Sequence, residues 1–78
     1  MLQFEFHTYD ANAANPVVTT ERLAGDSSAR SMAGRLAKKN GGPVDLARAG
    51  GADWADRYLT TASPSPHHVS GYQFERLT

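Results

Sequence analysis

The segment of residues 26–42, DSSARSMAGRLAKKNGG, most constrains the fold, because the sequence marks both of its ends and its buried stripe. Asp26, Ser27 or Ser28 can cap the first turn of a helix with a side-chain oxygen. Asn40-Gly41 supplies a left-handed stop, which glycine adopts without steric cost. Between these ends, apolar residues recur at helical spacing, namely Ala29, Met32, Ala33, Leu36 and Ala37. The segment therefore predicts one amphipathic helix that packs through one face.

The predicted helix also carries half of the basic residues. The chain has eight basic and eight acidic residues and no formal net charge, and residues 27–44 contain no carboxylate. The basic residues of the helix are Arg30, Arg35, Lys38 and Lys39. They predict a local basic surface on a neutral body. An ordinary solvated helix face, with its lysines complementing the helix dipole, accounts for the same pattern.

The remaining segments predict a sheet. Residues 1–9 alternate, with Leu2, Phe4 and Phe6 on one side and polar residues on the other, which is typical of a half-buried strand. A loop at 10–16 precedes a second strand at 17–23. Further strands are expected at 44–49, 54–61 and 72–77. A helical turn at 52–55 can precede the second of these, and a proline-rich loop at 63–68 precedes the third.

This order, β-β-α-β-β-β, predicts an α+β fold. We expect one domain over residues 1–78, with an antiparallel sheet of four to five strands and one amphipathic helix packed on one face. With 78 residues the core is small, and without cysteine it holds by packing alone. No apolar run approaches the roughly 18 residues that span a bilayer, and the first ten residues alternate instead of forming a signal peptide. We therefore expect a cytoplasmic protein.

Few residues suggest chemistry. His7, His67 and His68 can meet at a metal only if the first and last strands pair, and adjacent histidines in extended chain point apart. The serines near His67 and His68 lack the turn and oxyanion loop that nucleophilic catalysis uses. We expect no metal, no cofactor and no enzyme.

Two surfaces are candidates for binding. Asp45, Asp53 and Asp56 flank Gly50-Gly51 and Trp54, a composition typical of a protein-binding hot spot, although Trp54 can equally fill the small core. The basic helix is the second candidate. The predicted partner-binding residues are therefore Arg30, Arg35, Lys38, Lys39, Asp53, Trp54 and Asp56.

An alternative function combines the basic helix with aromatic residues on an open sheet face, as nucleic-acid-binding domains do. Tyr9, Tyr58 and Tyr72 are the candidate stacking residues. The net charge of zero argues against a large phosphate footprint, so direct binding of nucleic acid is the second choice.

In its size, its lack of cysteine, its single helix and the absence of a catalytic set, the chain resembles small proteins of phages and other mobile elements, the anti-CRISPR proteins among them. The resemblance implies a non-enzymatic inhibitor that binds a type I CRISPR effector complex in a bacterial host cell and blocks target DNA. Anti-CRISPR proteins share no motif, so the resemblance assigns no residue a role. Many of them mimic DNA through strong negative charge, which this neutral chain lacks.

Overall fold

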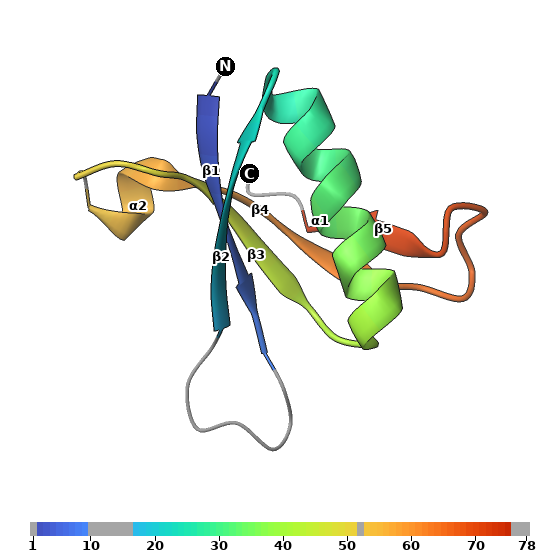
Figure 1. Cartoon of the computed structure of the whole chain (residues 1–78). Helices are drawn as coiled ribbons and strands as arrows, with labels where there is room; N and C mark the ends of the chain where they lie inside the picture. The colour runs from blue at the N-terminus through green and yellow to red at the C-terminus, as the bar shows by residue number, and fades with distance from the viewer. Residues whose placement is uncertain (1, 10–16, 52, 76–78) are drawn as a thin grey trace.

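The computed structural model describes residues 2–9, 17–51 and 53–75 and contains a five-stranded antiparallel sheet with one main helix on one face (Figure 1). The strand order across the sheet is β2-β1-β3-β4-β5. This arrangement confirms the predicted α+β fold. The elements are β1 (Leu2–Thr8), β2 (Val17–Leu23), α1 (Asp26–Asn40), β3 (Val44–Arg48), α2 (Trp54–Arg57), β4 (Tyr58–Pro64) and β5 (Tyr72–Phe74).

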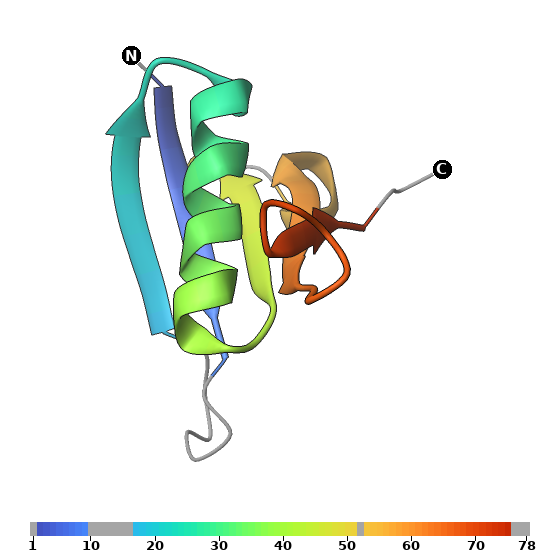
Figure 2. The same cartoon turned by 90° about the vertical axis from the view of Figure 1, so that its right-hand side faces the viewer.

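The core lies between α1 and the face of the sheet that it covers, and Figure 2 shows the helix lying along that face. The strict alternation of β1 turns Phe4 and Phe6 toward the helix, and both are fully buried. Alanines at helical spacing let α1 approach the sheet closely. The fully buried residues of this cluster are Phe4, Phe6, Ala29, Ala33, Ala37, Val44, Leu46 and Ala62, and Met32 and Leu36 pack against it. The predicted apolar stripe of the helix is thus confirmed.

The two ends of α1 differ in how well the sequence predicted them. The helix begins at Asp26 with Gly25 as its N-cap and without a side-chain cap, so the prediction of an Asp or Ser cap was wrong. Asp26 instead forms an ion pair with Arg48 at 2.9 Å, which ties the start of the helix to β3. At the other end, Gly41 has a φ of 68° and donates to the carbonyl oxygen of Ala37, which confirms the predicted stop.

A glycine inside α1 makes room for the last strand. Gly34 is buried, and the ring of Tyr72 from β5 occupies the space that a Cβ atom at Gly34 would need. Tyr72 also contacts Phe74, with ring centroids 5.6 Å apart. The small residue therefore lets β5 pack directly on the helix.

The elements after β3 differ from the prediction in their bounds: the helical turn and the strand after it begin later than expected, and Glu75, predicted in the last strand, follows the end of β5. Trp54–Arg57 is a helical turn, closed by bonds from the amides of Asp56 and Arg57 to the carbonyl oxygen of Asp53, and the strand begins only at Tyr58. The strand then continues to Pro64, so the following loop starts later than expected. The predicted loop at 10–16 and the end of the last predicted strand, 76–77, lie outside the described residues. Within the described ranges, no helix is long and apolar enough to cross a membrane.

Candidate functional site on the open face of the sheet

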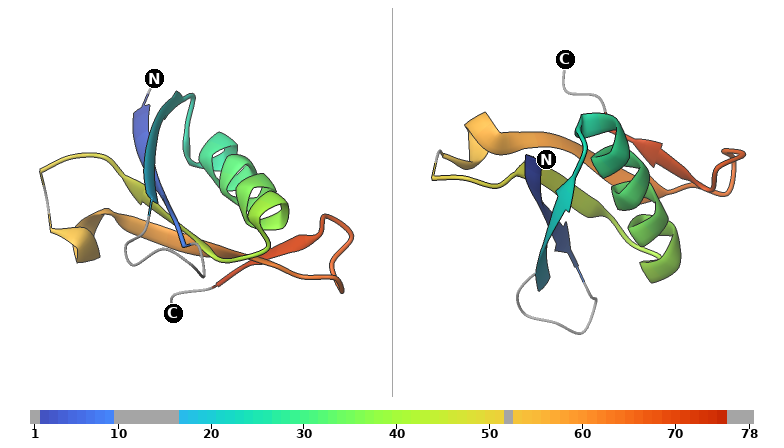
Figure 3. Two further views of the ribbon diagram at one scale, coloured as in Figure 1. Left: turned by 60° about the horizontal axis from the view of Figure 1, so that its bottom comes forward. Right: turned by 45° about the horizontal axis from the view of Figure 1, so that its top comes forward.

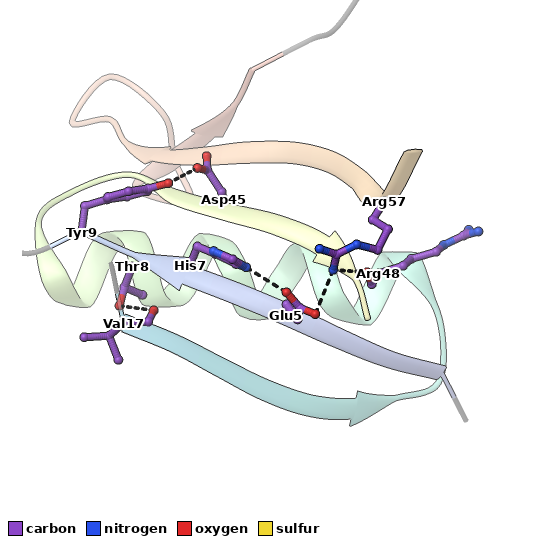
Figure 4. A network of polar contacts seen from close by, with 8 residues as sticks. All are labelled: Glu5, His7, Thr8, Tyr9, Val17, Asp45, Arg48 and Arg57. Atoms are coloured by element: carbon purple, nitrogen blue, oxygen red, sulfur yellow. Dashed lines mark hydrogen bonds and ion pairs between the residues drawn. The ribbon is translucent and has the colours of Figure 1, made fainter. Parts of the chain in front are cut away.

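The face of the sheet opposite α1 carries an ordered set of polar and aromatic side chains. Figure 4 views part of this set, with α1 behind the strands. Since side chains alternate along a strand, these residues occupy the positions between the core residues of β1, β3 and β4, joined by residues of α2. We call this surface the open face and define it by Glu5, His7, Tyr9, Asp45, Trp54, Arg57, Tyr58 and Thr61.

One half of the open face is a chain of charged contacts. His7 Nε2 and Glu5 Oε1 lie 3.0 Å apart, and Arg57 donates to Glu5 Oε2 at 2.8 Å. Arg57 also donates to the carbonyl oxygen of Arg48 at 3.2 Å. The hydrogen bond with His7, and to a lesser extent Arg57, lower the pKa of Glu5 against the opposing effect of burial. These contacts attach α2 to β1 and β3.

The other half is a chain of hydrogen bonds centred on Asp45. Tyr9 donates to Asp45 Oδ2 at 2.5 Å, and Thr61 donates to Asp45 Oδ1 at 2.6 Å. The hydroxyl groups of Thr61 and Tyr58 are hydrogen-bonded to each other. The bond to Asp45, with burial as a smaller cause, raises the pKa of Tyr9. Both carboxylate oxygens of Asp45 are thus engaged, and the tyrosines are held in fixed positions.

Trp54 lies over these two chains and is 38% exposed. Its ring centroid is 4.6 Å from that of His7 and 5.7 Å from that of Tyr58. The guanidinium carbon of Arg57 lies 5.6 Å from the indole centroid, within the range of a cation–π contact. The helix-side core does not include Trp54. Of the two roles that the sequence allowed, the structure places Trp54 at the surface.

A bulge in β4 places Tyr58 on this face. Leu46 pairs with Thr60 and Ala47 pairs with Tyr58, so Leu59 is an extra residue with no partner in β3. Simple alternation would have put Tyr58 on the same side as Thr60, toward the helix. The extra residue instead lets Leu59 pack against the core and turns Tyr58 outward. The alternation of the sequence gave no sign of this bulge, so the tyrosine's position was unpredictable.

The predicted partner-binding residues fall into two groups that are not adjacent. The acidic and aromatic group, Asp53, Trp54 and Asp56, is exposed at α2, and its Trp54 belongs to the open face. The basic group, which we call the basic helix surface, is exposed on α1 and consists of Arg30, Arg35, Lys38 and Lys39. Figures 1 and 3 show α1 and α2 on opposite sides of the sheet. The structure therefore does not unite the seven residues in one patch.

The candidate nucleic-acid residues are divided in the same way. Tyr9 and Tyr58 lie on the open face, whereas Tyr72 packs against α1. The basic helix surface and the three tyrosines therefore do not lie on one continuous surface. The histidines are also separate, because β3 and β4 lie between β1, which carries His7, and β5, which follows His67 and His68. Among the residues that the structure describes, no group of three or more His, Cys, Asp or Glu side chains could hold a metal ion.

The arrangement offers recognition by stacking and by charge. The Trp54 indole contacts the rings of His7 and Tyr58 and is still partly exposed, and Asp53 and Asp56, close to it in sequence, are exposed as well. Comparisons of the chain with protein-family models, with curated proteins and with solved structures found no match.

Proposed function

We propose that the protein is a non-enzymatic protein-binding module that contacts its partner through the open face. The observation that carries this proposal is the position of Trp54, a partly exposed indole outside the core. Its neighbours His7, Tyr58 and Arg57 are themselves held by hydrogen bonds or ring contacts. A rigid aromatic side chain costs little entropy on binding, which is why tryptophan is enriched among hot spots.

The charges around Trp54 favour a basic partner. Asp53 and Asp56 are exposed on either side of it in sequence, and Glu5 and Asp45 lie on the same face. Arg57 offsets one of these charges through its bond to Glu5. Such a surface repels phosphate and complements lysine and arginine, so it suits a protein that itself binds nucleic acid.

The most specific form of the proposal is an anti-CRISPR role, which rests on the class-level resemblance of the chain. In this form, the open face covers basic residues of a type I CRISPR effector complex and so blocks target DNA. The mechanism is steric and electrostatic and requires no reaction by the protein. The alternative, a small nucleic-acid-binding domain, would use the basic helix surface on the opposite side of the sheet.

The test measures how tightly a purified type I effector complex binds labelled target DNA at rising concentrations of the protein. We expect the protein to weaken DNA binding, and Trp54→Ala to reduce its affinity for the effector by a factor of at least about 30. The double reversal Asp53→Lys with Asp56→Lys should also remove inhibition, and this loss should be weaker at high salt.

The matched control reverses two charges of the basic helix surface, Arg35→Glu with Lys39→Glu. Lys38 is left unchanged because its aliphatic stem runs against Gly71, where a Cβ atom would come within 2.9 Å of it. The control should inhibit as the parent does. Inhibition that survives Trp54→Ala but is lost in the control would assign the interface to α1 and overturn the open-face proposal.

A pull-down from bacterial lysate, treated or untreated with nuclease, separates the two functions. Effector subunits that the parent retains after nuclease treatment, and that Trp54→Ala loses, are the expected result. Recovery of nucleic acid, with proteins lost on nuclease treatment, would contradict the protein-binding proposal and favour the alternative.

A further inference from the structure

The outer edge of β2 is an unprotected strand edge. β2 is the terminal strand of the sheet in the described part of the chain, and Figure 2 shows it at the outer side with no element beside it. All seven of its residues pair with β1 in one unbroken register. Val17 is 56% exposed and Val18 is 49% exposed. The opposite edge strand, β5, has only three residues.

Edge strands of soluble proteins usually carry a device that discourages pairing with another chain. The common devices are proline, a bulge, charged side chains, lysine above all, and a very short strand. β2, with the sequence VVTTERL, contains no proline and no lysine, its pairing with β1 shows no register shift, and its two charged residues, Glu21 and Arg22, are of opposite sign. Its β-branched residues favour extended backbone. The edge is therefore competent to accept another strand.

The direction of the backbone groups on this edge follows from the neighbouring strands. The carbonyl oxygen of Gln3 accepts from the amide of Ala49, so it points toward β3. In an antiparallel sheet, the backbone groups of successive residues point alternately to the neighbouring strand on one side and on the other. The backbone groups of Phe4 and Phe6 therefore point toward β2, where these residues pair with Glu21 and Thr19. The amides and carbonyls of Val18, Thr20 and Arg22 then point outward.

We propose that two copies of this chain associate through antiparallel pairing of their β2 strands, with Thr20 opposite Thr20 on a two-fold axis. This register places Val18 opposite Arg22 and Val17 opposite Leu23 of the other copy. It pairs every outward amide and carbonyl of Val18, Thr20 and Arg22. All seven residues of each strand take part.

The charges of β2 select this register over its neighbours. A register with Glu21 on the two-fold axis would place two glutamates opposite each other, and one with Arg22 on the axis would place two arginines opposite each other. Like charges in directly opposite positions destabilise a strand pair. Centring on Thr19 leaves both Arg22 and Leu23 without a partner in the other β2 strand. The register centred on Thr20 has no like-charge pair and covers Val17 with the partially buried Leu23. Two-fold symmetry then doubles each of these contacts.

The association leaves both proposed surfaces accessible. α1 packs mainly over β3, β4 and β5, and α2 stands at the far end of the open face. A single pair of strands buries less than the roughly 1,000 Å² of a typical specific interface. We therefore expect a dimer whose population rises with protein concentration, in addition to the binding proposed for the open face.

The first test is sedimentation velocity of the full chain over a wide range of concentrations. We expect the mass to rise from that of the 8.4 kDa monomer toward twice that value. Thr20→Pro removes an amide that points outward and that β1 does not use, so the fold should persist while the dimer is lost. Thr20→Val keeps the amide and should dimerise as the parent does.

The second test examines the register and needs no proline. Val18→Lys places a lysine opposite Arg22 of the other copy at two symmetric positions and should weaken the dimer by a factor of at least about five. Adding Arg22→Glu to this variant converts both repulsive pairs into attractive ones and should restore association. Within the described residues, neither Val18 nor Arg22 takes part in an ion pair.

Three results would overturn the proposal. The first is that the parent protein remains a monomer at every concentration tested. The second is that Thr20→Pro folds, by circular dichroism, and still dimerises with unchanged affinity. The third is that the charge exchange between positions 18 and 22 fails to rescue Val18→Lys, which would exclude the register even if Thr20→Pro does not fold.

Discussion

The helix-covered face and the open face use alternate residues of the same strands, but they are held by different interactions. On the covered face, Phe6 is fully buried among apolar side chains of α1 and β3. On the open face, the next residue, His7, contacts a carboxylate and the ring of Trp54. Burial of apolar surface contributes most of the stability of a small domain, whereas exposed polar contacts contribute little. The covered face therefore contributes most of the stability, and the open face is the surface that we propose for binding.

Truncation of two neighbouring residues of β1 should show the largest difference in stability between the two faces. Phe6→Ala removes a fully buried ring and should lower the free energy of unfolding by about 3–4 kcal/mol, because a cavity remains in the core. His7→Ala should cost at most about 1 kcal/mol. Urea unfolding followed by circular dichroism measures both. Equal losses would show that the open face contributes as much to stability as the core.

The contact between Gly34 and Tyr72 tests how tightly the covered face is packed. Alanine favours a helix over glycine by about 1 kcal/mol, yet Gly34→Ala should destabilise the protein by about 1–2 kcal/mol, because its methyl group meets the ring of Tyr72. In a Tyr72→Ala background the same substitution should become neutral or stabilising. A Gly34→Ala protein as stable as the parent would mean that β5 moves easily away from the helix.

The two faces also differ in how far the sequence predicted them. The helix, its stop at Gly41 and the buried side of β1 follow from local patterns: helical spacing, a glycine with positive φ and strict alternation. The position of Tyr58 depends on a bulge, and that of Gly34 on a contact with a strand distant in sequence. Neither leaves a periodic signal, because each is decided by tertiary packing.

The candidate site was predictable only in its parts. The composition around Trp54 predicted a binding surface, which stays a prediction, and Asp53 and Asp56 are exposed in the structure. The sequence did not indicate that Glu5, His7 and Tyr9, which lie 45 to 49 positions before Trp54, share a face with it, because strand order decides which residues meet. It also could not show that the basic helix surface lies on the opposite side.

Trp54 offers a smaller effect that sharpens the assignment of the open face. Trp54→Ala should lower stability by about 1 kcal/mol, well below the loss for Phe6→Ala, since the ring is partly exposed and outside the core. As the only tryptophan, it also reports its surroundings through fluorescence, and iodide should quench it in the folded protein. A loss of stability similar to that of Phe6→Ala, together with protection from iodide, would contradict the proposed role of Trp54.

The smallest expected effect is a pH dependence that belongs to the open face alone. His7 and Arg57 lower the pKa of Glu5 below its ordinary value of 4.5, so the unfolded chain takes up this proton before the folded protein does. The contribution of Glu5 is therefore fully present above pH 4.5 and is lost as the pH falls through the lower pKa of the folded state.

The contribution of Glu5 to the free energy of unfolding should be at most about 1 kcal/mol, as for a partly exposed ion pair. Glu5→Gln should flatten the fall in stability below pH 4.5 by that amount. If the curves of the parent and Glu5→Gln coincide, the contacts with His7 and Arg57 do not favour the charged carboxylate, and the open face is less ordered than its hydrogen bonds indicate.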